Sequence, residues 1–384
     1  MAKGEFNGFM KILHTADLHL DSPFASLSGE MALRAKSELR SIFSDMLSYA
    51  VKENTDLILI SGDLFDSGFA TRETAALIIR EFEKVSCPVV IAPGNHDACD
   101  AKSIWKLISL PENVHVFRSS ELSSLDLPEI GARVYGYAFE SQSMKTCPFA
   151  GKSVEDANII NILCAHGDTA SPLSAYCPIT AGDLEAFGAD YAALGHIHNP
   201  EAANEALLSR GISAAYCGCP QGRDFGECGQ KGALLVEIEK AEGKARVNTT
   251  FVPFSKKIYR ELTFTLDGAE TTADVISELR TLIRGTDADE STVLRAYLEG
   301  YVDPRLSILT SEVEEGCKDG LCALTVINNT VPMLSSRELE MDRGIKGEVY
   351  KLLSPAINDG TAEEKSEALS ALRYALGALG GDNI

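Results

Sequence analysis

The sequence is poor in histidine and tryptophan, and it has no long apolar segment. No apolar run approaches the roughly eighteen residues that a membrane-spanning helix needs. The polar, glycine-containing start, residues 1–10, has no apolar core of the kind found in a signal peptide. We therefore expect a cytoplasmic protein that has no association with a membrane.

The ten cysteines are scattered without regular spacing, which argues against a disulfide framework and favours reduced thiols. The pairs Cys217/Cys219 and Cys317/Cys322 have spacings that a zinc site could use, but neither has a matching second pair. We interpret all four as ordinary buried or surface thiols.

Basic residues are also in deficit, with 35 against 56 acidic residues and a net charge of −21. This balance argues against a protein that binds nucleic acid through its overall charge. It leaves a nuclease open, because two divalent cations would offset the ligand carboxylates and make the site itself positive. Solubility is the simpler explanation of the acidity, and we prefer it.

The few histidines are concentrated, because six of the seven lie within or beside five short clusters and only His115 lies elsewhere. Carboxylate, imidazole and amide oxygen are the ligand set of two-metal hydrolytic sites. The clusters, in chain order, are Asp17-Leu18-His19 with His14 just ahead, Gly62-Asp63, Gly94-Asn95-His96-Asp97, His166-Gly167-Asp168 and Gly195-His196-Ile197-His198.

Strand and helix patterns alternate along the chain, which predicts an α/β fold. Each cluster comes just after the carboxyl end of a predicted strand, where open α/β sheets place their ligands. A buried structural histidine is the competing explanation for one cluster, but not for five in the same position. The strands concerned are expected at 11–16, 57–60, 88–92, 158–164 and 191–194, with helices at 31–53, 71–86 and 180–187.

The spacing within the clusters suits metal binding. Asp17/His19 and His196/His198 are i, i+2 pairs, which an extended segment projects to one side. Asp63 follows a glycine, and a carboxylate on a sharp turn can bridge two cations roughly 3.5–4 Å apart.

His96 has a different neighbour, Asp97, which suggests a different role. A carboxylate partner favours the protonated imidazole, which can protonate a leaving alkoxide. Asp97 could instead be a turn residue that bonds its own backbone. Asp168 could orient His166 or cap the segment that follows it.

The series D-x-H, G-D, G-N-H-D, H-G and G-H-x-H resembles the calcineurin-like metallophosphoesterase superfamily. Residues 12–23 and 62–68 narrow the resemblance to the SbcD-type DNA repair exonucleases. Residues 217–227, followed by Lys231-Gly232, point to the same branch. The resemblance covers about residues 11–255.

The resemblance implies a sandwich of mixed sheets flanked by helices, and two divalent ions, Mn²⁺ by preference. It makes His96 the catalytic histidine, with Asp97 as its partner. Asp66 stands where some relatives carry a histidine, which leaves the preference for a DNA end open. The implied ligands of one ion are Asp17, His19, Asp63 and His198, and those of the other are Asp63, Asn95, His166 and His196.

We expect three parts: a nuclease domain over 1–255, a capping domain over 256–338 and a helical segment over 339–384. The β-α-β-α-β order expected in 256–338 indicates a small α+β domain, with dimerisation or a purely structural role as alternatives.

Two helical patterns in 343–380, separated by Asn358-Asp359-Gly360, suggest a docking site for an SMC-like or AAA-type ATPase. In that case we expect a partly exposed apolar stripe. Packing on the chain's own capping domain is the alternative. The stripe consists of Val349, Leu353, Leu372 and Leu376.

The expected function is hydrolysis of DNA in DNA repair, by a 3′ to 5′ exonuclease with endonuclease activity on single strands. Arg223 and Lys231 are candidates for contacting the DNA. A small-molecule or nucleotide phosphodiesterase would use the same ligands. A non-catalytic scaffold that binds DNA ends, and a homodimer, are further alternatives.

Overall fold

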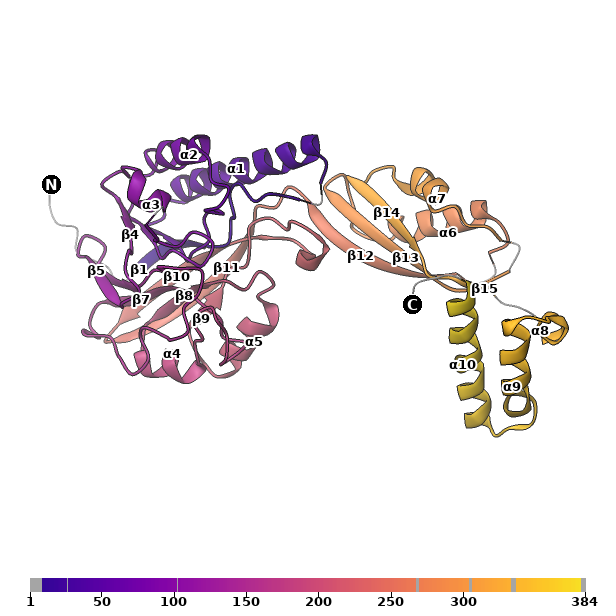
Figure 1. The fold of residues 1–384 in the computed structure, drawn as a ribbon. Coiled ribbons are helices and arrows are strands. Elements are labelled where there is room, and N and C mark those ends of the chain that lie inside the picture. Colours follow the sequence, from indigo (N-terminus) through magenta and orange to yellow (C-terminus); the bar gives the residue numbers. More distant parts are fainter. Residues whose placement is uncertain are drawn as a thin grey trace. The chain divides into compact units, whose positions relative to one another are not determined.

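The computed structural model describes residues 9–380, apart from residues 26, 102, 267–268, 304–305 and 333–335. The chain divides into two compact units, Met1–Ile258 and Tyr259–Ile384. Figure 1 follows the chain through both. Within the described residues, no helix has the length and apolar character needed to cross a membrane.

The first unit contains a six-stranded mixed sheet in the order β11-β10-β1-β2-β3-β4. Strands β1 to β4 run parallel to one another, and β10 pairs antiparallel with both β1 and β11. The strands are β1 (Phe9–Thr15), β2 (Leu57–Ile60), β3 (Val89–Ile91), β4 (Val114–Val116), β10 (Gly232–Ala241) and β11 (Lys244–Pro253).

A five-stranded sheet in the order β5-β6-β7-β8-β9 lies against the first. Its strands from β6 to β9 are parallel, and β5 pairs antiparallel with β6. The strands are β5 (Ser123–Leu127), β6 (Ala132–Gly136), β7 (Ile160–His166), β8 (Tyr191–Gly195) and β9 (Ala214–Tyr216).

Helices cover the outer faces of the two sheets (Figure 1). Along α1, Leu39, Phe43, Met46 and Leu47 are buried at helical spacing, so one apolar face packs on the first sheet. All four residues of β2 are buried, as expected for a strand covered on both faces. The helices are α1 (Gly29–Lys52), α2 (Arg72–Phe82) and α3 (Ile104–Leu107) on the first sheet, and α4 (Ala181–Phe187) and α5 (Glu201–Ser209) on the second. The expected α/β sandwich of mixed sheets flanked by helices is confirmed.

Two glycines allow the two sheets to meet closely at the ends of their strands. Gly62 has a φ of +91°, and a Cβ there would overlap the ring of His166. A Cβ at Gly195 would overlap the backbone of Ser61. Because only glycine fits these positions, the carboxyl ends of β2 and β8 can lie side by side.

The second unit is built on a sheet in the order β12-β13-β14, with β15 beside β13. Val275, Leu279 and Val313 of its helices pack with strand residues such as Leu294 and Ala296 in one core. The expected β-α-β-α-β order is present. The sequence pattern also predicts a helix around 303–316, of which residues 304–305 lie outside the described residues. The elements are β12 (Ile258–Leu266), α6 (Thr272–Arg284), β13 (Thr292–Val302), α7 (Thr310–Cys317), β14 (Ala323–Asn328) and β15 (Val331–Pro332).

The second unit ends in α8 (Ser336–Met341), α9 (Ile345–Asp359) and α10 (Ala362–Gly380). The expectation of a partly exposed apolar stripe is wrong for Leu372 and Leu376, which are buried, whereas Val349 and Leu353 are only partly buried. Leu372 and Leu376 of α10 are buried with Leu339 and Tyr350, and Val349 and Leu353 pack against them. The stripe therefore forms the core of the helix pair, because two amphipathic helices in a hairpin cover each other's apolar faces.

A different apolar face of α9 is exposed. Ile345 is 67% exposed and Leu352 is 80% exposed. They lie seven residues apart, which places them on the same side of the helix.

Candidate metal centre

The seven predicted ligand residues come together at the carboxyl ends of five strands. Asp17 and His19 follow β1, Asp63 follows β2 and Asn95 follows β3. His166 is the last residue of β7, and His196 and His198 follow β8. Parallel strands in two facing sheets therefore deliver all seven to one edge of the sandwich, as the sequence predicted.

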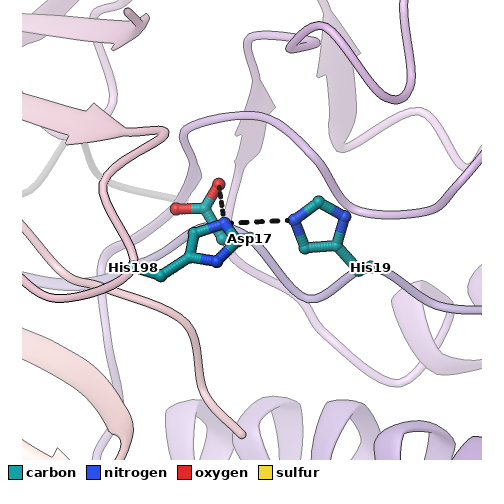
Figure 2. A group of neighbouring side chains, drawn as sticks. All are labelled: Asp17, His19 and His198. Carbon is teal, nitrogen blue, oxygen red and sulfur yellow. Dashed lines mark hydrogen bonds and ion pairs between the residues drawn. The ribbon is translucent and has the colours of Figure 1, made fainter. Parts of the chain in front are cut away.

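One group consists of Asp17, His19 and His198, shown in Figure 2. Nε2 of His19 lies 3.2 Å from Nε2 of His198. That atom of His198 lies 3.7 Å from Oδ1 of Asp17. Three ligand atoms thus face one small volume.

A second group surrounds Asp63. Nε2 of His166 lies 3.5 Å from Oδ2 of Asp63 and 3.1 Å from Oδ1 of Asn95. The ring of His196 lies 5.2 Å from the ring of His166. Because Oδ2 of Asp63 is also 3.8 Å from Nε2 of His19, Asp63 lies between the two groups, where a bridging ligand must stand.

The other ring nitrogen of three of these histidines is held by an acceptor. Nδ1 of His19 is 2.7 Å from Oδ1 of Asp66, and Nδ1 of His198 is 2.6 Å from Oε1 of Glu227. Nδ1 of His166 donates to the backbone oxygen of Ser61 at 2.8 Å. An ionised carboxylate or a carbonyl oxygen can only accept, so each Nδ1 carries a hydrogen, and in the neutral ring, the form that binds a metal ion, each Nε2 presents a lone pair.

These tautomers place acceptors against acceptors. The lone pairs of His19 and His198 face each other at 3.2 Å, and that of His166 faces Oδ1 of Asn95 at 3.1 Å. Between neutral rings such contacts are repulsive unless a metal ion or a proton lies between the atoms. Imidazole, carboxylate and amide oxygen are a donor set that divalent transition metals accept. The residues present therefore fit a pair of divalent ions.

The centre is also anionic and buried. Asp17 and Asp63 are each 1% exposed. Burial tends to raise the pKa of Asp63, but the neighbouring His166, His19 and His96 outweigh it and the net pKa is lowered. A buried carboxylate that is ionised, as the lowered pKa favours for Asp63, needs positive charge beside it, which cations would supply.

His96 differs from the ligands because its side chain is 48% exposed. Its backbone N–H donates to Oδ1 of Asp63 at 2.9 Å, which fixes its position beside the centre. Its Nδ1 lies 3.0 Å from Oδ1 of Asp66. The hydrogen bond to Asp66 raises the pKa of His96, against the opposing effect of burial.

The partner expected for His96, Asp97, is not the one observed. The Asp97 carboxylate accepts from the backbone N–H groups of Gly94, Asp63 and Leu64 at 2.6, 3.1 and 3.0 Å. The Asp97 side chain binds to the turn because the buried N–H groups of the turn need an acceptor. Asp97 therefore has the structural role that was its alternative, and Asp66 takes its place beside His96.

The contacts of Asp168 likewise distinguish between its two possible roles, as a cap and as a partner of His166. Its Oδ1 accepts from the backbone N–H of Ala170 at 2.7 Å, and Nδ1 of His166 is already bonded to Ser61. Asp168 therefore caps the segment that follows it and does not orient His166.

The two basic side chains expected to contact DNA, those of Arg223 and Lys231, form hydrogen bonds within the protein. Arg223 donates to Oε1 of Glu227 at 2.8 Å. Lys231 is 4% exposed, and its Nζ donates to the backbone oxygen of His198 and to Oδ1 of Asn199. Both side chains thus lie beside the turn that carries His198, near the candidate metal centre, and their contact with DNA stays a prediction.

Sequence reasoning missed Asp66 and Glu227 as partners of histidines. Asp66 follows Asp63 by three residues, which was a usable indication that both face the same centre. Glu227 lies 29 residues from His198, and no local pattern connects them.

Comparison with known proteins agrees with this geometry. Residues 10–200 match the family model of the calcineurin-like phosphoesterases. The match places this part of the chain in the calcineurin-like metallophosphoesterase family.

Two relatives have similar sequences. The uncharacterized metallophosphoesterase YhaO of Bacillus subtilis (strain 168) is 31% identical over 244 residues, which cover 61% of this chain and 58% of that protein. The chain thus spans little more than half the length of this relative. One subunit of the nuclease SbcCD from Staphylococcus epidermidis is 28% identical over 289 residues, which cover 66% of this chain and 71% of that protein.

A solved structure, that of TT1561 of Thermus thermophilus, is 14% identical and aligns with a TM-score of 0.34. The alignment covers 62% of this chain and 98% of that one.

Proposed function

We propose that this chain is a two-metal phosphodiester hydrolase that cleaves DNA and uses Mn²⁺. The observation that carries the proposal is the close approach of candidate ligand atoms, 3.2 Å between Nε2 of His19 and Nε2 of His198 and 3.1 Å between Nε2 of His166 and Oδ1 of Asn95. Divalent cations held there would lower the pKa of a bound water and balance the charge of a phosphodiester.

His96 is the proposed general acid. It is exposed on the solvent side of the centre, and Asp66 raises its pKa, so the protonated ring persists to higher pH than in a free imidazole. Its Nδ1 faces Asp66, which leaves Nε2 as the atom that can donate to a leaving alkoxide. Asp66 acts on the reaction by holding this ring.

DNA is the proposed substrate because the relative from Staphylococcus epidermidis is described as part of a nuclease. We further propose 3′ to 5′ exonuclease activity with cleavage of single strands, in DNA repair. A small-molecule or nucleotide phosphodiesterase is the second candidate. The internal bonding of Arg223 and Lys231 favours it, because a nuclease would be expected to offer free cations to the DNA backbone.

The test is hydrolysis of three substrates by the purified chain with Mn²⁺, with Mg²⁺ and with EDTA. The substrates are end-labelled single-stranded DNA, end-labelled duplex DNA and bis-p-nitrophenyl phosphate. We expect all three to be cleaved with Mn²⁺ and none with EDTA. Cleavage of the small diester without any cleavage of DNA would favour the second candidate, and hydrolysis in EDTA would overturn the two-metal proposal.

A further inference from the structure

The segment 221–231 lies against the turn that carries His198, and it contributes a buried glutamate to that turn. Glu227 ends the short 3₁₀ helix η1 (Phe225–Glu227) and is 8% exposed. A carboxylate is rarely buried unless other groups satisfy it. The contacts of the Glu227 carboxylate therefore indicate its role.

Both oxygens of Glu227 are bonded. Oε1 lies 2.6 Å from Nδ1 of His198 and accepts from the Arg223 guanidinium at 2.8 Å. Oε2 accepts from the backbone N–H of Arg223 at 2.8 Å. The carboxylate is thus held on one side by Arg223 and offers an oxygen to the imidazole on the other.

Arg223 also lies 3.1 Å from Nδ1 of His198, and this contact cannot be a hydrogen bond in the same state. Nδ1 has one site in the plane of the ring, and the shorter contact places its hydrogen toward Glu227. A guanidinium has no acceptor for that hydrogen. Arg223 therefore holds Glu227, which in turn orients the His198 ring, and the charge of Arg223 also acts on His198 directly, in the direction that lowers its pKa.

The same segment holds the backbone around His198. Nζ of Lys231 donates to the His198 oxygen at 3.3 Å and to Oδ1 of Asn199 at 2.6 Å. Nδ2 of Asn199 donates back to the oxygen of Gly226 at 2.8 Å. The ring and the backbone of His198 are therefore both fixed from one side.

We infer that residues 221–231 form a brace for the candidate metal centre, with Glu227 as the positioning residue that holds His198 in the tautomer whose Nε2 lone pair faces Asp17 and His19. The inference rests on the proposed function in one respect only, which is that the centre binds metal ions. A preset ligand loses little freedom when the ion arrives, so the brace raises metal affinity.

Metal binding to the full-length protein, measured without substrate, tests the brace. Mn²⁺ is titrated by calorimetry into metal-free wild type, Glu227→Gln, His198→Ala and the double variant. We expect Glu227→Gln to weaken one of two binding events by roughly 10–100-fold, the usual effect of losing such a partner. The double variant should be no weaker than His198→Ala alone, because Glu227 acts through that ring.

The control is Glu185→Gln, which removes the carboxylate of an exposed pair with Arg210 and should leave both binding events unchanged. Circular dichroism of each metal-free variant checks the fold. If Glu227→Gln does not fold, Arg223→Gln is used in its place, with a smaller loss expected at the same event.

Two results would overturn the inference: unchanged Mn²⁺ affinity in folded Glu227→Gln, or a loss that adds fully to that of His198→Ala. Normal binding of two ions by a wild-type protein that cleaves no phosphodiester would instead defeat the proposed function and leave the brace intact.

Discussion

Oδ1 of Asp66 lies 3.0 Å from Nδ1 of His96. The same oxygen lies 2.7 Å from Nδ1 of His19, so one carboxylate orients both the proposed general acid and a proposed metal ligand. The two imidazole rings are 4.7 Å apart and meet edge to face. A change at Asp66 should therefore affect the protonation of His96 as well as metal binding.

The first prediction concerns Asp66→Asn. The hydrogen bond to Asp66 raises the pKa of His96 above its usual 6.5, so the acid form persists to higher pH. An amide cannot supply that charge, and activity that needs protonated His96 should then decline at lower pH than in wild type. The measurement is the pH–rate profile at saturating Mn²⁺. An alkaline limb that does not move would contradict the role of Asp66.

The second prediction concerns His96→Ala. No candidate ligand contact is lost, so the variant should still bind two ions. Its turnover should decrease by roughly 10²–10⁴-fold, as expected for a missing general acid. Metal analysis beside steady-state kinetics measures both effects. If the variant binds one ion fewer, His96 is a ligand and the assignment is wrong.

The third prediction compares two candidate ligands. Asp63 lies between both groups, whereas Asn95 contacts one. Asp63→Asn should abolish hydrolysis and weaken both ions, and Asn95→Ala should weaken one. Calorimetric titration with Mn²⁺ counts the affected events. Equal effects of the two substitutions would argue against a bridging carboxylate.

The positions of the candidate ligands could be predicted from the sequence because each lies in a local motif at the end of a strand. The two carboxylates that contact the Nδ1 atoms of His19 and His198 could not be predicted in this way. Asp66 and Glu227 reach His19 and His198 across 47 and 29 residues, which spacing alone cannot connect. Asp97 was misassigned because sequence proximity to His96 says nothing of the backbone N–H groups that the turn leaves unpaired.

The sequence prediction for the C-terminal helices was limited for the same reason, that local patterns do not show long-range contacts. Helical periodicity identified the apolar positions of 343–380 correctly, but it gives no information about which surface covers them. Leu372 and Leu376 are covered by α9 and neighbouring residues of the same unit. Strands β10 and β11 were not anticipated at all, although Leu234, Val236 and Ile238 alternate as a half-buried strand should.

The fourth prediction concerns pH and His14, which is fully buried between Tyr191 and Ser61. Burial lowers the pKa of His14 to about 3. The unfolded chain therefore protonates His14 below pH 6.5, whereas the folded chain does so only below about pH 3. The stability that neutral His14 contributes is complete above pH 6.5 and decreases as the pH falls toward 3.

The matched variant is His14→Gln, which cannot titrate. Between pH 7 and pH 5, metal-free wild type should lose about 2 kcal/mol more unfolding free energy than the variant does. Urea unfolding followed by fluorescence is suitable, because the single tryptophan, Trp105, is buried in the first unit. Equal losses in the two proteins would mean that His14 is not excluded from protonation.

The fifth prediction concerns α9 and the proposed ATPase partner. Leu352→Glu alters an exposed residue, so the thermal stability should change little. If an SMC-like ATPase binds this face, the substitution should abolish its co-purification with the chain. Lys351→Glu, an exposed neighbour on α9, is the control for added negative charge. Binding that survives Leu352→Glu would exclude this face as the docking site.

Four of the seven candidate ligands have left-handed backbone conformations. Asp17, His19, Asp63 and His196 have φ values of 54°, 47°, 53° and 108°. Residues with a Cβ adopt such angles at a cost, which asparagine and glycine largely avoid. Selection for thermal stability alone would therefore favour replacing these very residues, and so would act against the candidate metal centre.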